Sequence, residues 1–166
     1  MKFSRLSLCK GLVGACVLGL LVVAGSTQRV DAQGGGQGGY ITEAAARLTK
    51  LVEQANKDGY KLQDNSFSIG GGWLKQSASD WIPLYTVQLN GGTKYRFLAS
   101  GDKDAKDVDI EIQDAKGKTV AADVDTAADA KVDFAPKETG RYLVRIRLYD
   151  SKDNLPCVCL GIVMSK

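Results

Sequence analysis

The centre of the chain alternates between apolar and polar residues, and this alternation constrains the fold more than any other feature. Between positions 107 and 117, Val108, Ile110 and Ile112 occupy every second position and mostly charged residues fill the positions between them. A period of two is typical of a β-strand with one face in a core and one in water. A turn at the end of this segment and a second alternating run over 141–149 predict antiparallel hairpins.

Other short strand-like runs recur at spacings typical of all-β domains. We expect strands near 66–74, 82–89, 93–100, 107–114, 118–123, 131–134, 141–149 and 157–164. About eight antiparallel strands with alternating patterns predict an all-β, two-layer β-sandwich over residues 62–166.

One amphipathic helix is expected before the strands, over 41–58. Its apolar positions recur at helical spacing: Ile41, Ala45, Leu48, Val52 and Ala55. Thr42 is the expected N-cap and Gly59 the expected stop. A single helix is marginal in water, so this stripe needs a partner surface. The domain's own sheet is one candidate, and a second copy or a membrane surface are the others.

The N-terminal segment, residues 1–32, has the order of a cleaved signal peptide. Basic residues precede an apolar run over 12–24, and small residues ending at Ala32 mark the expected cleavage site. The run is too short for a membrane-spanning helix, although a lipoprotein signal ending at Cys16 is an alternative. We therefore expect a secreted or periplasmic protein with no transmembrane segment after cleavage, beginning with a flexible glycine-rich tether over 33–40.

The charge balance excludes one class of partner. The whole chain has 22 basic and 19 acidic residues, and removal of residues 1–32 leaves 18 of each. A neutral mature chain does not have the basic footprint of a nucleic-acid-binding protein. Its length of about 134 residues suits a single core.

The strand and turn residues carry a resemblance to a known family. They lie in the segments Tyr85–Phe97, Gly101–Asp102, Asp107–Asp114, Gly117–Ala121, Phe134–Pro136 and Thr139–Ile146. Together they resemble the bacterial pre-peptidase C-terminal domain over roughly residues 85–164. The resemblance implies a jelly-roll-like sandwich that is secreted, usually appended to extracellular hydrolases and not itself catalytic. Here a helix and a strand region stand where the peptidase would precede it.

Catalytic chemistry has little support in the sequence. The chain contains no histidine, so a nucleophile activated by histidine and a histidine-containing zinc site are both excluded. Asp107, Asp109 and Glu111 share one strand face, which we interpret as solvated. Three arginines are expected opposite them in exposed pairs: Arg96, Arg145 and Arg147. We predict that the protein is not an enzyme and has no catalytic residues.

Calcium is the one cofactor for which the sequence offers a candidate site. Four carboxylates fall within eight residues: Asp102, Asp104, Asp107 and Asp109. Carboxylate oxygens are the ligands that calcium prefers, although the segment lacks the glycine and glutamate of an EF-hand loop. The alternative is a polar turn.

Cys157 and Cys159 are the cysteines that remain after signal cleavage. They lie two apart in a strand, about 6.7 Å between Cα atoms, near the upper limit for a disulfide. Because Val158 and the alternating residues after it are better core candidates, the thiols are expected beneath the helix as small packing residues. A strained disulfide and a soft-metal site are the alternatives.

Trp73 and Trp81 flank the polar segment 75–80 and are candidates for a ligand surface that binds sugar or peptide; core packing is the alternative.

The sequence therefore predicts a secreted, non-catalytic β-sandwich module that binds, or is accessory to, an extracellular protein or polysaccharide. The alternative is a structural, envelope-associated protein that assembles through its N-terminal helix.

Overall fold

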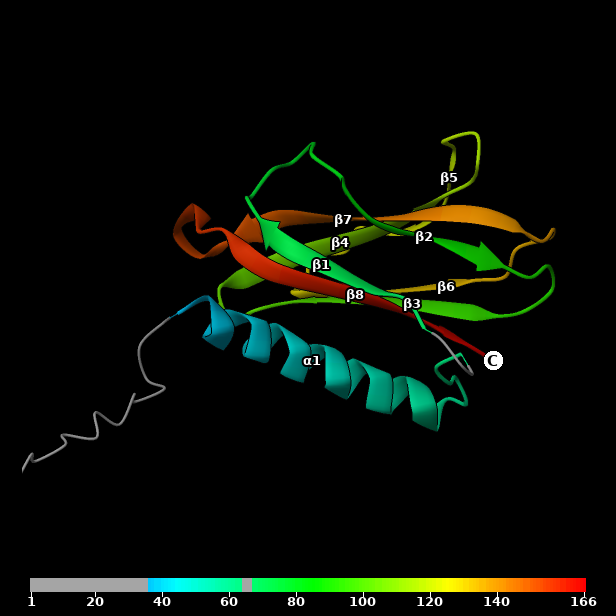
Figure 1. Ribbon diagram of the computed structural model, residues 1–166. Helices are drawn as coiled ribbons and strands as arrows, with labels where there is room; N and C mark the ends of the chain where they lie inside the picture. The colour runs from blue at the N-terminus through cyan, green and yellow to red at the C-terminus, as the bar shows by residue number, and fades with distance from the viewer. Residues whose placement is uncertain (1–35, 64–66) are drawn as a thin grey trace, which may run out of the picture. The chain divides into compact units, whose positions relative to one another are not determined.

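The computed structural model describes residues 36–63 and 67–166. The predicted signal peptide, the alternative lipidation site at Cys16 and the first residues of the tether lie outside the described residues. One α-helix is followed by eight strands (Figure 1). The elements are α1 (Gln37–Lys57), β1 (Ile69–Leu74), β2 (Ile82–Leu89), β3 (Tyr95–Gly101), β4 (Ala105–Gln113), β5 (Thr119–Asp123), β6 (Asp129–Phe134), β7 (Gly140–Ser151), the short 3-10 helix η1 (Lys152–Asn154) and β8 (Cys157–Ser165).

The strands form two four-stranded antiparallel sheets with the orders β1-β8-β3-β6 and β2-β7-β4-β5. Strands at mirror positions in the sequence pair with each other: β1 with β8, β2 with β7, β3 with β6 and β4 with β5. Further pairing of β3 with β8 and of β4 with β7 joins these pairs into sheets. This is the order of a long hairpin rolled into a jelly roll, so the predicted fold is confirmed.

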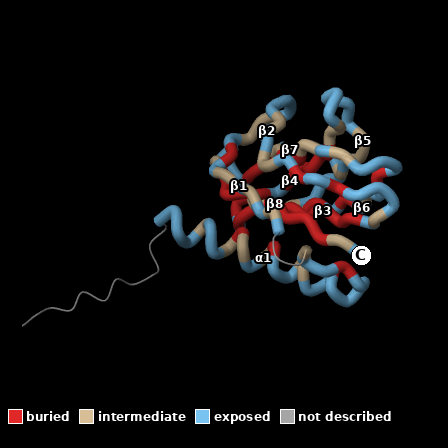
Figure 2. Tube along the Cα trace, turned by 45° about the vertical axis from the view of Figure 1, so that its right-hand side comes forward, coloured by how far each residue is buried: buried red, intermediate tan, exposed pale blue. Residues whose placement is uncertain are grey.

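The main core lies between the two sheets. Val108, Ile110 and Ile112 of β4 point into it and are fully buried, as their alternation predicts. They meet Phe97 of β3 and Val163 of β8 in the same cluster. Figure 2 shows that β3 and β8 are buried along nearly their whole length, because their sheet is covered on both faces.

The helix α1 covers the outer face of the β1-β8-β3-β6 sheet. Leu48 and Ala55 pack with Leu98 of β3 and with Ile162 and Met164 of β8 in a separate apolar cluster. The prediction that the stripe docks on the domain's own sheet is therefore confirmed. No helix in the described ranges is long and apolar enough to cross a membrane.

The helix begins earlier than the sequence indicates, and the buried position in its first turns differs from the expected one. It starts at Gln37, after Gly36, and the predicted N-cap Thr42 instead lies inside it, where its hydroxyl donates to the carbonyl of Gly38 at 2.9 Å. The predicted tether is thus helical from Gln37. Ile41 is 52% exposed and Ala44 is buried in its place. Tyr40 in the first turn contacts Trp73 of β1.

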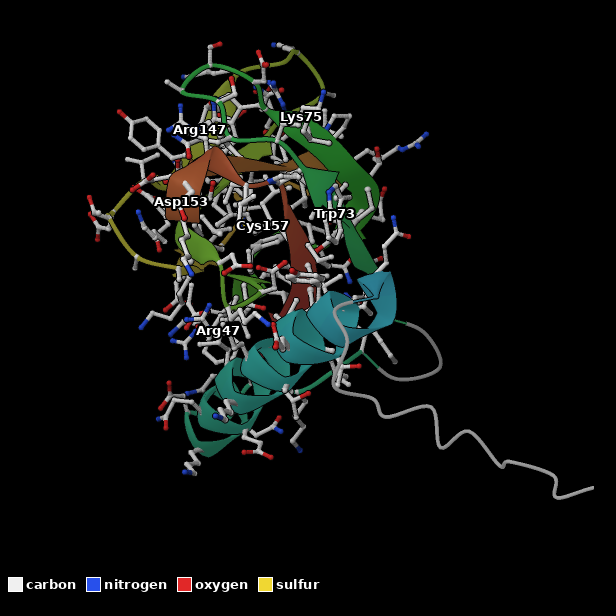
Figure 3. All side chains as sticks on the ribbon, turned by 90° about the vertical axis from the view of Figure 1, so that its left-hand side faces the viewer. Arg47, Trp73, Lys75, Arg147, Asp153 and Cys157 are labelled. Carbon is white, nitrogen blue, oxygen red and sulfur yellow. The ribbon has the colours of Figure 1, made fainter. Side chains whose placement is uncertain are left out.

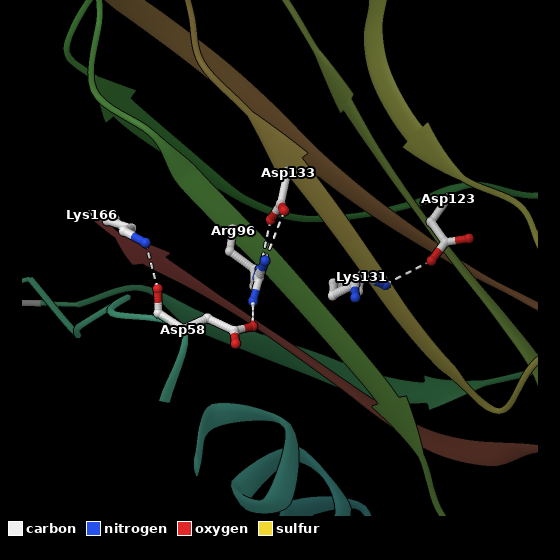
Figure 4. Close-up of polar contacts among 6 residues, drawn as sticks. All are labelled: Asp58, Arg96, Asp123, Lys131, Asp133 and Lys166. Atoms are coloured by element: carbon white, nitrogen blue, oxygen red, sulfur yellow. Dashed lines mark hydrogen bonds and ion pairs between the residues drawn. The ribbon is translucent and has the colours of Figure 1, made fainter. Parts of the chain in front are cut away.

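Polar contacts fasten the C-terminal end of α1 to the sheet (Figure 4). The guanidinium of Arg96 on β3 donates to Asp133 on β6 at 2.6 and 2.8 Å and to Asp58 at 2.5 Å. Hydrogen bonds from Arg96 hold the pKa of Asp133 below its ordinary value. The expectation that Arg96 faces the β4 carboxylates is wrong, because the two belong to different sheets.

The outer face of β4 is not solvated, which corrects a second expectation. Asp109 is 2% exposed and Glu111 is also buried. They lie directly opposite Arg147 and Arg145 of β7 and pair with them at 2.6 and 3.1 Å. The predicted partners are right, but segment 75–81 shields the pairs from water: its backbone carbonyls at Ala78 and Trp81 accept hydrogen bonds from the two arginines.

Candidate functional site

An apolar groove lies between the first turns of α1 and the β1–β8 side of the β1-β8-β3-β6 sheet. Its volume is about 280 Å³, and it is lined by Gln37, Ile41, Gly71, Gly72, Trp73, Val158 and Leu160. Figure 3 looks onto this side of the molecule, where Trp73 lies next to the start of the helix. Trp73 is 44% exposed, so a large aromatic surface is open to solvent beside the groove.

Glycines bring the strands of this region close together. Gly71 pairs with Leu160 of β8, and a Cβ at Gly71 would collide with the Leu160 side chain and lie 2.6 Å from the carbonyl oxygen of Cys159. A Cβ at Gly70 would lie 2.9 Å from the ring of Tyr85 in the opposite sheet. Glycine in a strand marks such close approaches, and here it also leaves the floor of the groove flat.

Trp73 is held in place by the helix. The rings of Tyr40 and Trp73 meet edge to face, with centroids 5.3 Å apart. The ammonium of Lys103 lies 5.1 Å from the Tyr40 ring and pairs with Glu43 at 3.3 Å. The groove is therefore an apolar and aromatic surface, with polar groups from the helix at its border, and it suits an apolar side chain or the face of a sugar ring.

Trp81 does not share this surface. It lies on the outer face of the other sheet, where its ring stacks on the guanidinium of Arg147 at 4.6 Å. Tyr149 stacks on the same guanidinium at 4.9 Å. Of the two tryptophans singled out in the sequence, Trp73 borders a groove and Trp81 covers a buried ion pair.

The four candidate calcium ligands have different surroundings. Asp102 is fully buried, and its carboxylate accepts hydrogen bonds from the backbone N–H of Asp104 at 3.0 Å and of Val158 at 2.6 Å. Asp109 is engaged by Arg147. Asp102 and Asp109 thus already accept hydrogen bonds from protein donors. Asp102 stabilises a turn, and Asp109 belongs to an ion pair.

Asp107 differs from Asp102 and Asp109. It is 5% exposed, and its Oδ1 has no hydrogen-bond partner among the described residues. Burial raises its pKa, and the nearby carboxylate of Asp109 raises it further, although Arg147 lowers it. Within residues 36–63 and 67–166, no three acidic, cysteine or histidine side chains are grouped to hold a metal ion. Calcium binding stays a prediction.

Cys157 and Cys159 are free thiols in the core. They pack between the two sheets, not beneath the helix, and Val158, Ile162 and Met164 take the outer face instead. The expected orientation of β8 is therefore wrong. Burial raises the pKa of Cys157 to about 12 and also raises that of Cys159, so both thiols hold their protons more tightly than an exposed cysteine does.

Sequence reasoning missed the residues that complete the groove. Tyr40 was placed in a tether, and Ile41 was expected to be buried. The run Gly70–Gly72 inside a strand was the available signal, because consecutive glycines in a strand indicate a close approach of another chain segment or of a ligand.

A comparison with models of known protein families finds no match, and a comparison with curated proteins finds none either. The class that the structure defines is an eight-stranded antiparallel β-sandwich with one N-terminal helix packed on it.

Proposed function

We propose that this protein is a secreted, non-catalytic binding module whose ligand surface is the groove beside Trp73. The observation that supports this proposal most directly is the partly exposed tryptophan, fixed by Tyr40 over a glycine floor. A large side chain that is held in one orientation but left open to solvent is typical of a contact surface.

The resemblance to the pre-peptidase C-terminal domain supports an accessory role. That family is usually attached to extracellular hydrolases, and the proposed client here is an extracellular protein or polysaccharide. A non-catalytic role agrees with a chain that has no histidine and with two thiols whose pKa values are raised by burial.

The alternative of assembly through the N-terminal helix has less support, because α1 uses its apolar stripe within the molecule. Leu48 and Ala55 are buried against β3 and β8. A helix whose apolar face is already covered has little left to offer a partner.

Tryptophan fluorescence tests the proposal. In a Trp81→Phe variant the emission reports on Trp73, and we expect titration with soluble oligosaccharides or with extended peptides to shift it. Trp73→Ala should abolish binding of the same ligand in a direct calorimetric assay, whereas Trp81→Phe, the matched control on the other face, should bind normally. Binding that survives Trp73→Ala would contradict the assignment of the groove.

A further inference from the structure

The two sheets end in four edge strands, and three of them carry features that discourage pairing with another chain. The edge strands are β1, β6, β2 and β5. On β6, every second residue is charged: Asp129, Lys131 and Asp133. The strand β2 is interrupted by Pro83 and by an irregularity in its pairing. The strand β5 is only five residues long. Charges, proline, irregularities and short length are the usual protections of a sheet edge.

The fourth edge strand, β1, has no charge, no proline and no pairing irregularity, and it is one residue longer than β5. Its six residues, Ile-Gly-Gly-Gly-Trp-Leu, include no charge and no proline, and its pairing with β8 is regular throughout. No strand in the described part of the chain pairs with its other edge. An apolar, regular edge strand is a template for a further strand.

The side chains of β1 are complementary to themselves. Ile69 and Trp73, 53% and 44% exposed, lie on the outer face of the sheet with Gly71 midway between them. In an antiparallel pair, directly opposite residues point to the same face. If two β1 strands pair with Gly71 opposite Gly71, each Ile69 lies opposite Trp73 of the second copy.

We propose that two copies of this protein associate by antiparallel pairing of their β1 strands around a two-fold axis at Gly71. The pairing joins two four-stranded sheets into one continuous sheet. It forms two isoleucine–tryptophan pairs, which are among the favourable cross-strand combinations. The glycine on the axis has no side chain to obstruct the approach, and the strand brings no like charges together.

The dimer goes beyond the proposed binding function and does not depend on it. Trp73 borders the groove, but Ile69 does not line it. In the dimer, Ile69 of the second copy lies next to Trp73 at the edge of the groove. A substitution at Ile69 therefore disrupts association of the two copies but leaves all groove residues of the single copy unchanged. Ligand binding by the monomer can then be measured separately from dimer formation.

The extent of the contact sets the expected affinity. Six residues from each copy form a smaller interface than the roughly 1,200 to 2,000 Å² of stable complexes, so the pair belongs to the weak, transient class. We expect a dissociation constant in the micromolar range and an equilibrium that shifts with protein concentration.

Analytical ultracentrifugation of the purified protein over a wide concentration range tests the association. We expect a reversible monomer–dimer equilibrium, and we expect Ile69→Asp to weaken it at least tenfold because a charge then faces Trp73 of the second copy. The matched control is Val124→Asp, since Val124 is a 60% exposed apolar residue away from β1. A monomer up to millimolar concentration, or a dimer that Ile69→Asp leaves unchanged, would overturn the proposal.

Disulfide cross-linking tests the register of the proposed pair directly. Opposite Cα atoms in an antiparallel pair are about 4.5 to 5.5 Å apart, within the range of a disulfide. We expect a mixture of Ile69→Cys and Trp73→Cys to form a cross-linked dimer under mild oxidation. Each variant alone should not, because its two cysteines would be about 13 Å apart along the strands. Cys157 and Cys159 are buried, and Cys9 and Cys16 are replaced by serine in both variants, so that only the introduced cysteines can cross-link. If either variant alone cross-links to the same extent as the mixture, this register is overturned.

Discussion

The outer faces of the two sheets are covered by different chemistry. On the β1-β8-β3-β6 sheet, helix α1 buries an apolar layer that includes Leu48 and Ile162. On the β2-β7-β4-β5 sheet, no described helix is present and the irregular segment 75–81 covers a row of ion pairs, Asp109–Arg147 and Glu111–Arg145. The face under α1 is stabilised because apolar surface is removed from water. On the other face, each buried carboxylate is compensated by an arginine partner.

This difference predicts different responses to mutation. An apolar layer loses stability in proportion to the surface that is exposed or disrupted. A buried ion pair contributes little compared with apolar residues of the same size, but removal of one partner leaves an uncompensated charge and costs much more. The second face should therefore be more sensitive to single changes and more tolerant of paired ones.

The largest expected effect is that of Arg147→Met. Asp109 then stays buried without its partner, and we expect the free energy of unfolding to fall by about 3 to 5 kcal/mol. The double variant Arg147→Met/Asp109→Leu should recover most of this loss. Chemical denaturation measures both, with the exposed Arg141→Met on the same strand as control. A double variant as unstable as the single one would contradict this account of the ion-pair face.

Leu48→Asp tests the apolar face. Leu48 is buried between α1 and the sheet, and loss of its burial alone should lower stability by roughly 1.5 to 3 kcal/mol. Ala46→Asp places the same charge on the exposed side of the helix and should leave the melting temperature nearly unchanged. Equal melts for both variants would mean that the helix contributes nothing to the stability of the sandwich.

The sequence predicted the elements well but not what covers them. Seven of the eight strands begin and end within two residues of the expected positions, and β1 begins three residues later than expected. The agreement arises because a period of two and the intervening turns are local signals. The alternation on β4 correctly separates Ile110 from Asp109. It cannot tell that a distant segment, 75–81, folds over the charged side.

The same limit explains the inverted orientation of β8. A strand buried on both faces is apolar at every position, so the alternation of Cys157 and Cys159 with larger residues does not show which side meets the other sheet. The groove was missed for a related reason. Tyr40 and Trp73 are 33 positions apart in the sequence, and only their contact in the folded protein shows that they form one surface.

The smallest expected effect concerns Asp107, which lies on the charged face but lacks a partner among the described residues. Its pKa is raised by burial and by Asp109. The folded state therefore holds the proton more tightly than the unfolded state, and stability falls as pH rises from the unfolded pKa, about 3.9, through the raised folded value. Above that window, Asp107→Asn should stabilise the protein by about 1 kcal/mol; below pH 3 the gain should vanish. A gain that is independent of pH would point to a cause other than this charge.

Addition of calcium tests the role of Asp107 in a second way. Since Asp102 and Asp109 already have protein donors, Asp107 is the carboxylate with most to gain from a cation. A cation that binds only to the folded state adds about 2.7 kcal/mol at a hundredfold excess over its Kd. If the predicted site exists, millimolar calcium added to metal-stripped protein raises the melting temperature of the native chain but not that of Asp107→Asn. Identical melts with calcium and with a chelator would contradict the site, and the stabilisation by Asp107→Asn alone would then show that this end of β4 holds an unpaired charge as a cost of the fold.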